Sequence, residues 1–132
     1  MILLDTSAFY ALANAGDPRH REATAILEAL RSAEERLVVH SYVVVETAAL
    51  LQDRSGHATA ARFLRDAAAY ETVWVDAEIH RDGLALFAQL KARDTSLVDC
   101  VSFSVMRRRG ITTAFAFDRH FLQQGFRLAE PR

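Results

Sequence analysis

The sequence has few of the residues that cross-link a chain or interrupt its regular structure. Its 132 residues include one cysteine, Cys100, so no disulfide can form within the chain. A lone thiol of this kind suits a reducing compartment. Only two prolines and five glycines are present, and no stretch has the composition of a flexible linker. We therefore expect a single domain that spans residues 1–132.

Two further absences narrow the class of protein. No apolar run approaches the ~20 residues of a membrane-spanning helix, and the opening MILLDTSAF lacks the basic start of a secretory signal. These features predict a cytoplasmic protein that has no membrane association. Positive charge is not in excess either, because the net charge is −1. Binding to nucleic acid would therefore depend on a local patch, not on the overall field.

The obvious local patch is the run Arg107, Arg108 and Arg109. Cations at the end of a helix also complement the helix dipole. From the run alone we favour this structural interpretation over a nucleic-acid contact.

What the sequence does contain is a regular alternation of short apolar runs with longer amphipathic segments. We expect strands at 2–5, 37–40, 72–76 and 112–117, with a short one at 127–130. We expect the intervening segments to be helices, capped by Thr6 or Ser7, by Ser41 and by Ser96. Strands that are apolar on both faces are typical of a parallel sheet covered by helices. The pattern predicts an α/β fold, a three-layer α/β/α sandwich with a mostly parallel sheet.

Four acids stand in or beside these apolar segments: Asp5, Glu46, Asp99 and Asp118. Asp5 and Asp118 each follow an expected strand, while Glu46 and Asp99 lie near the start of helices. In an open α/β sheet these positions meet at the carboxyl edge of the strands, where ligands bind. Four carboxylates close together repel one another unless a cation lies between them. The sequence therefore predicts a metal site.

Each acid also has an ordinary interpretation when it is taken alone. Asp5 suits a helix cap and Asp99 suits a helix N-terminus, while Asp118 suits a turn. Glu46 shares a helix face with Asp53 and could belong to a solvated stripe. Their joint position at one edge of the sheet is the argument for a site.

The donor set indicates the metal and the reaction. Carboxylate oxygens suit Mg²⁺ or Mn²⁺, whereas the five histidines and Cys100 show no zinc-ligand spacing. Metal-assisted attack of water on a phosphodiester fits such a site. Thr6 could assist at the metal, although a cap is the simpler role. Asp94 is either a fifth acid or an exposed loop residue, and we favour the loop.

The whole chain resembles the PIN-domain ribonucleases, in particular the VapC-type toxins of VapBC toxin–antitoxin pairs. Four segments in order carry the resemblance: ILLDTSAFYAL, VVVETAALL, SLVDCVSFSVM and AFAFDRHFLQQGFRL. The resemblance implies a Rossmann-like sandwich and Mg²⁺- or Mn²⁺-dependent cleavage of RNA. It assigns Asp5, Glu46, Asp99 and Asp118 as metal-binding acids, and Thr6 as the hydroxyl residue beside the first. It also implies a homodimer and a small antitoxin protein that covers the acidic site.

Two other functions stay open at this point. One is a PIN-like module that binds RNA or protein without catalysis, although its acids are intact. The other is a small-molecule phosphohydrolase that uses Asp5 as nucleophile. That chemistry needs an acid two residues later, where this chain has Ser7.

Overall fold

The strands form one parallel sheet, as the sequence predicts. The computed structural model describes residues 1–131; Arg132, the last residue of the expected domain, lies outside the described residues. The sheet has the order β3-β2-β1-β4-β5, and every pair is parallel. Its strands are β1 (Ile2–Leu4), β2 (Leu37–His40), β3 (Glu71–Val73), β4 (Thr113–Phe115) and β5 (Arg127–Leu128).

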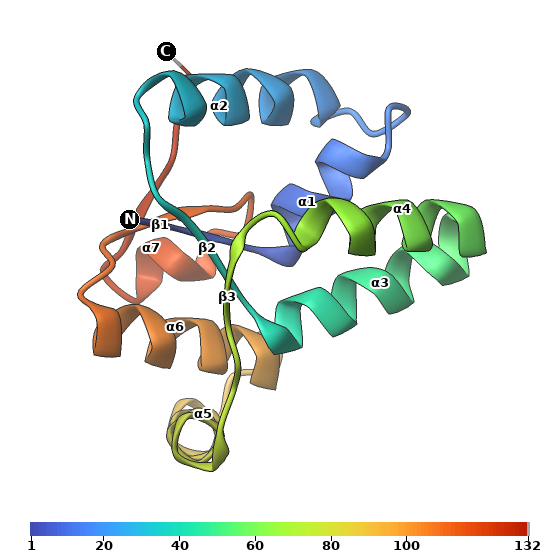
Figure 1. Ribbon diagram of the computed structural model, residues 1–132. Helices are drawn as coiled ribbons and strands as arrows, with labels where there is room; N and C mark the ends of the chain where they lie inside the picture. The colour runs from blue at the N-terminus through green and yellow to red at the C-terminus, as the bar shows by residue number, and fades with distance from the viewer. Residues whose placement is uncertain (132) are drawn as a thin grey trace.

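Helices cover both faces of this sheet (Figure 1). They are α1 (Thr6–Ala13), α2 (His20–Ser32), α3 (Ser41–Ser55), α4 (His57–Ala67), α5 (Ala77–Leu90), α6 (Leu97–Arg109) and α7 (His120–Gln123). Successive residues of β1 point to opposite faces: Ile2 and Leu4 pack with α1 to α4, whereas Leu3 packs with α6 and α7. The three-layer α/β/α sandwich is therefore confirmed.

Helix α6 is the central element of one layer. Every side chain from Cys100 to Met106 is buried, because the sheet lies on one side of the helix and α5 on the other. Gly83 of α5 makes this packing close: a Cβ atom there would lie 2.6 Å from Cγ2 of Val101. The first turn of α6, which carries Asp99, is thus held on a buried and rigid element.

Several element ends differ from the sequence-based expectation. Asp5 caps α1, which agrees with its ordinary interpretation as a helix cap and not with a cap at Thr6 or Ser7. His40, not Ser41, caps α3. The strand expected at 72–76 ends at Val73, and the four-residue helix α7 was not expected.

The arginine run at the end of α6 is engaged within the protein. Arg107 donates to Gln124, Arg108 pairs with Glu78 and Asp82, and Arg109 pairs with Glu71. These partners agree with the structural interpretation of the run, beside its role at the helix end. Among the described helices, none has the length and apolar character needed to cross a bilayer.

The close approach of α5 to α6 generates a stability prediction. Gly83→Leu should lower the free energy of unfolding by about 1–3 kcal/mol, because the added side chain overpacks against Val101. Ala85→Leu, on the exposed face of the same helix, should change it by less than about 0.5 kcal/mol. Urea unfolding of both variants measures the difference. Equal stability of the two would contradict the close packing.

Candidate metal centre

The parallel pairing of β1 with β4 brings the two ends of the sequence together. Leu4 pairs with Phe115, and the backbone N–H of Asp5 donates to the carbonyl of Phe115 over 3.0 Å. Asp5 directly follows β1, and Asp118 lies three residues beyond the end of β4. Both acids therefore leave the sheet at its carboxyl edge, as the alternation of strands and helices predicts.

Asp5 is held in place by Ser7. The Asp5 side chain is buried, and its Oδ2 accepts hydrogen bonds from the Ser7 backbone N–H at 3.1 Å and the Ser7 hydroxyl at 2.6 Å. The same hydroxyl accepts a hydrogen bond from the backbone N–H of Phe117 at 2.9 Å. Ser7 thus connects the first acid to the segment that precedes Asp118. Both Ser7 bonds use Oδ2 and leave Oδ1 for another partner.

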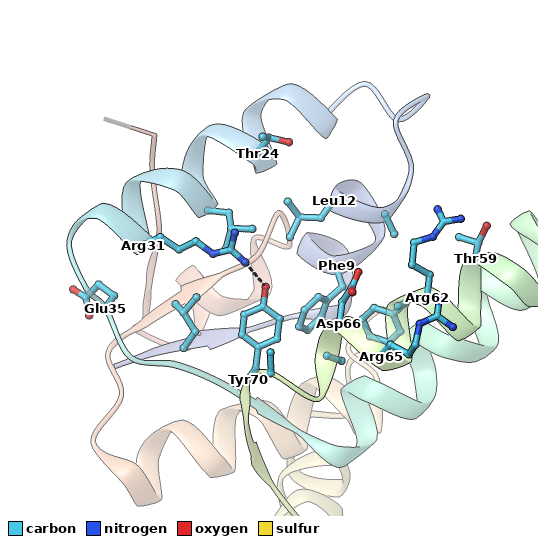
Figure 2. Close-up of a pocket in the computed structure, with 16 residues that line it drawn as sticks. Phe9, Leu12, Thr24, Arg31, Glu35, Thr59, Arg62, Arg65, Asp66 and Tyr70 are labelled. Carbon is cyan, nitrogen blue, oxygen red and sulfur yellow. Dashed lines mark hydrogen bonds between the residues drawn. The ribbon is translucent and has the colours of Figure 1, made fainter.

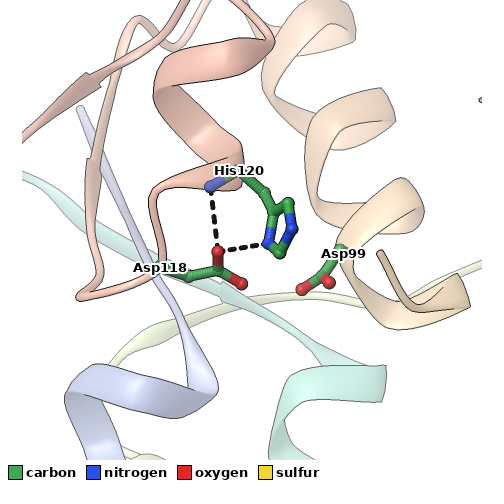
Figure 3. A group of neighbouring side chains, drawn as sticks. All are labelled: Asp99, Asp118 and His120. Carbon is green, nitrogen blue, oxygen red and sulfur yellow. Dashed lines mark hydrogen bonds and ion pairs between the residues drawn. The ribbon is translucent and has the colours of Figure 1, made fainter. Parts of the chain in front are cut away.

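Asp99 is held by the start of its own helix. Its Oδ2 accepts from the backbone N–H of Ser96 at 2.9 Å, and the Ser96 hydroxyl accepts from the backbone N–H of Asp99 at 3.1 Å. This capping box fixes the first turn of α6. The expected cap at Ser96 is therefore confirmed, and Figure 3 shows the Asp99 carboxylate facing Asp118 and His120.

Asp118 and His120 complete the group. Asp118 Oδ1 accepts from the backbone N–H of His120 at 2.9 Å and also contacts Nδ1 of the imidazole (Figure 3). One ligand atom from each of Asp99, Asp118 and His120 lies within 4.8 Å of the others. His120 was not among the predicted site residues. The available signal was its spacing from Asp118, two residues earlier and shortly after a buried strand.

The negative charges at this edge act on one another. Burial raises the pKa of Asp5 to about 6; the hydrogen bonds from Ser7 oppose this, and the charges of Asp99 and Asp118 add to it. Burial also raises the pKa of Asp99; the hydrogen bonds with Ser96 lower it, and the charge of Asp118 raises it further. Burial lowers the pKa of His120, but its contacts with Asp94 and Asp118 outweigh burial and the net pKa is raised.

This donor set fits a hard divalent cation. Asp5 is close enough for the charges of Asp99 and Asp118 to raise its pKa, although it lies outside the group of Asp99, Asp118 and His120. A cation between these carboxylates would relieve both the repulsion and part of the cost of burial. The hydroxyl oxygen of Thr6 is buried beside Asp5 and has no hydrogen-bond partner within the described chain. A polar atom in that condition fits a position beside a bound group. The residues present are therefore suitable for Mg²⁺ or Mn²⁺.

Glu46 and Asp94 lie differently. Glu46 is in the second turn of α3, which starts at the carboxyl end of β2, but its side chain is exposed and outside the group of Asp99, Asp118 and His120. Its role as a metal-binding acid remains a prediction. Asp94 is in an exposed loop, as favoured from the sequence, and its Oδ2 lies 3.2 Å from Nε2 of His120.

A surface groove lies elsewhere. A groove of about 770 Å³ lies between α1, α2 and α4, with Arg31 bonded to the Tyr70 hydroxyl across it (Figure 2). Its lining includes none of the candidate metal-binding acids. The chemistry proposed for the carboxyl edge of the sheet therefore does not involve this groove.

The raised pKa of Asp5 predicts a pH-dependent stability in EDTA. Its folded-state pKa of about 6 exceeds the ordinary 3.8, so the folded state binds more protons between these values. The contribution of Asp5 to the free energy of unfolding is therefore fully present below about pH 4 and is lost as the pH rises through 6. About two pKa units correspond to about 3 kcal/mol.

We expect Asp5→Asn to remove much of this pH dependence and to unfold at higher urea than the native chain at pH 7.5. Asparagine can still cap α1, so the fold is retained. Urea unfolding at pH 4.5 and 7.5 makes the comparison, with Asp53→Asn as the exposed control. Parallel pH profiles for the native chain and Asp5→Asn would contradict the burial argument.

Comparison with known proteins gives the same fold and names a family. Two proteins from Mycobacterium tuberculosis, strains CDC 1551 / Oshkosh and ATCC 25618 / H37Rv, are each called 23S rRNA-specific endonuclease VapC20. Each is 37% identical to this chain over 128 residues, which are 96% of this chain and 95% of the relative. The crystal structure of Mycobacterium tuberculosis VapC20, described as a Sarcin-Ricin loop cleaving toxin, superposes with a TM-score of 0.84. It has 33% identity and covers 96% of both chains. Residues 2–126 match the PIN domain, and the chain belongs to the PIN-domain family.

Proposed function

We propose that this chain is a divalent-metal-dependent endoribonuclease and the toxin of a toxin–antitoxin pair. The observation that carries the proposal is the convergence of Asp5, Asp99 and Asp118 at one edge of the sheet, where burial and mutual repulsion raise the pKa of Asp5 and of Asp99. Keeping like charges together is unfavourable in the free protein, so the arrangement makes sense as a cation site. Relatives named as RNA endonucleases support the choice of substrate.

The three acids have separate tasks in this proposal. Asp5 and Asp99 present one free carboxylate oxygen each, because Ser7 and Ser96 occupy the other. Asp118 faces Asp99 from the opposite segment. Mg²⁺ or Mn²⁺ held there would lower the pKa of water and offset negative charge on the phosphate under attack. Glu46, at the exposed side, would orient water or a second cation, and Thr6 would contribute its hydroxyl.

The other functions considered from the sequence are less well supported. A phosphohydrolase with Asp5 as nucleophile needs an acid at the position of Ser7, whose hydroxyl instead donates a hydrogen bond to Asp5. A binding module without catalysis has no need of buried acids that repel one another. RNA hydrolysis at a metal site accounts both for the serine at position 7 and for the buried acids.

The proposed target is a loop of the large ribosomal RNA, since both relatives are named for 23S rRNA. Recognition would depend on local cations and on RNA shape, because the net charge is −1. Two arginines lie near Asp118 or its sequence neighbours: Cζ of Arg19 is 4.8 Å from the centroid of the Phe117 ring, and the exposed Arg119 follows Asp118 in the sequence. The proposed place of action is the cytoplasm. An antitoxin that covers the acidic edge would block access of RNA.

The homodimer expected from the resemblance is also a proposal. Trp74 is 76% exposed and Val45 is 68% exposed, and both line one apolar hollow together with Leu64. Exposed apolar patches of this kind are typical of interaction sites. We place the contact between two copies at this Val45–Leu64–Trp74 patch.

Cleavage of RNA tests the proposed activity. Purified protein should cut large-subunit ribosomal RNA with Mg²⁺ or Mn²⁺ and should stop when EDTA is added. Asp99→Asn should reduce the rate by roughly 100-fold or more, while its amide can still accept the Ser96 bond. Asp53→Asn, which removes an exposed acid from α3, should cleave as the native chain does.

The products provide an independent control. Attack by water at the phosphate should leave a 5′-phosphate and a 3′-hydroxyl, which adaptor ligation can detect and map to the nucleotide. Cyclic 2′,3′-phosphate ends, or equal cleavage by the native chain and Asp99→Asn, would identify a contaminating ribonuclease. Metal binding without cleavage of any RNA would favour the binding module.

Sedimentation tests the proposed dimer. Trp74→Arg should weaken self-association by roughly 100-fold, because it introduces a charge into the apolar patch and removes its large aromatic side chain. Leu122→Arg is the matched control, since Leu122 is 44% exposed but lies on α7, outside the patch. An unchanged dimer in Trp74→Arg would place the contact elsewhere.

A further inference from the structure

His120 is the least expected member of the group at the carboxyl edge. Its ring lies between two carboxylates that come from different segments of the chain. Nε2 is 3.2 Å from Oδ2 of Asp94, and Nδ1 contacts Oδ1 of Asp118. The imidazole therefore has one nitrogen directed to the exposed loop and the other directed into the centre (Figure 3).

The two nitrogens differ in their surroundings. Nδ1 is buried and lies against Oδ1 of Asp118, although not in hydrogen-bond geometry. An ionised carboxylate can only accept a hydrogen bond, so Asp94 and Asp118 each favour a hydrogen on the nitrogen that they face. A cation bound between Asp118 and Asp99 would take the place of the hydrogen on Nδ1, which would leave for water, while Nε2–H would still donate to Asp94.

A pattern of this kind is common around metal ions in proteins. A histidine that binds a metal through one nitrogen usually donates its other N–H to a carboxylate, which sets the ring orientation. Asp94, His120, Asp118 and Asp99 supply all parts of such an arrangement, with ligand atoms of the last three within 4.8 Å of one another.

We propose that His120 is a nitrogen ligand of the metal, oriented by Asp94, and that it gives the centre a preference for Mn²⁺ over Mg²⁺. This inference rests on the proposed nuclease function and specifies the metal of that site. Imidazole is a good ligand for transition-metal ions, whereas Mg²⁺ prefers oxygen and binds nitrogen poorly. An all-carboxylate centre would not discriminate in this way.

The test is electron spin-echo spectroscopy of the protein loaded with Mn²⁺ alone. The native chain should show nitrogen-14 modulation from a coordinated imidazole, and labelling its histidines with nitrogen-15 should replace that signal. His120→Ala should lose the modulation. His57→Ala, which removes a ring at the exposed start of α4, should keep it.

Affinities measured in the same samples provide the second readout. His120→Ala should weaken Mn²⁺ binding by about tenfold or more, and Asp94→Asn by about tenfold. Mg²⁺ binding should change by less than about threefold in either variant, because it does not use the nitrogen.

The possible failures are distinguishable. Bound Mn²⁺ without nitrogen modulation in the native chain would overturn the assignment of His120, and metal-dependent RNA cleavage by the same sample would leave the nuclease proposal intact. Native protein that binds no Mn²⁺ would also overturn the assignment. If the same sample also fails to cleave RNA with either metal, the proposed function fails too.

Discussion

The burial of carboxylates at the end of adjacent parallel strands, together with the repulsion between them, is the constraint on which the site depends. The β1–β4 pairing fixes where Asp5 and Asp118 leave the sheet, and the rigid first turn of α6 adds Asp99. None of these positions can relax without loss of strand or helix hydrogen bonds. A cation bound at this edge would offset the free energy that it costs to keep the acids together.

Polar contacts convert this crowding into a defined geometry. Ser7 and Ser96 each take one oxygen of a carboxylate, which fixes its rotamer and leaves the second oxygen available. The hydroxyl of Ser7 also accepts a hydrogen bond from the backbone N–H of Phe117, so the orientation of Asp5 depends on the segment just before Asp118. Both serines also lie at helix N-termini, so the hydrogen bonds that cap the helices are the same ones that orient the carboxylates.

The fold and the main acids could be predicted because they follow from periodicity. Alternating strands and helices require parallel pairing, and parallel pairing puts Asp5 and Asp118 at one edge. The position of His120 beside Asp118 was not predicted, although the spacing of the two residues was a signal. Its contact with Asp94 could not be predicted, because Asp94 is distant in sequence and lies on an exposed loop. The exposure of Glu46 could not be predicted either. Its apolar neighbours indicated a buried helix face, but two of them, Val45 and Ala49, are themselves exposed. The cap of α3 was misplaced by one residue, since the acceptor at the end of β2, His40, competes with the hydroxyl of Ser41 that follows.

The contact between Ser7 and Phe117 joins residues that are 110 positions apart. Translation produces Asp5 early, but β4 and Asp118 come after α3, α5 and α6 have been synthesised. Until β4 takes its place between β1 and β5, Asp118 is not in position, and the Ser7 side chain that holds Asp5 lacks its hydrogen bond from Phe117. The proposed site can therefore be complete only after the last strands have joined the sheet, so a nascent chain that lacks β4 would not carry the proposed nuclease activity.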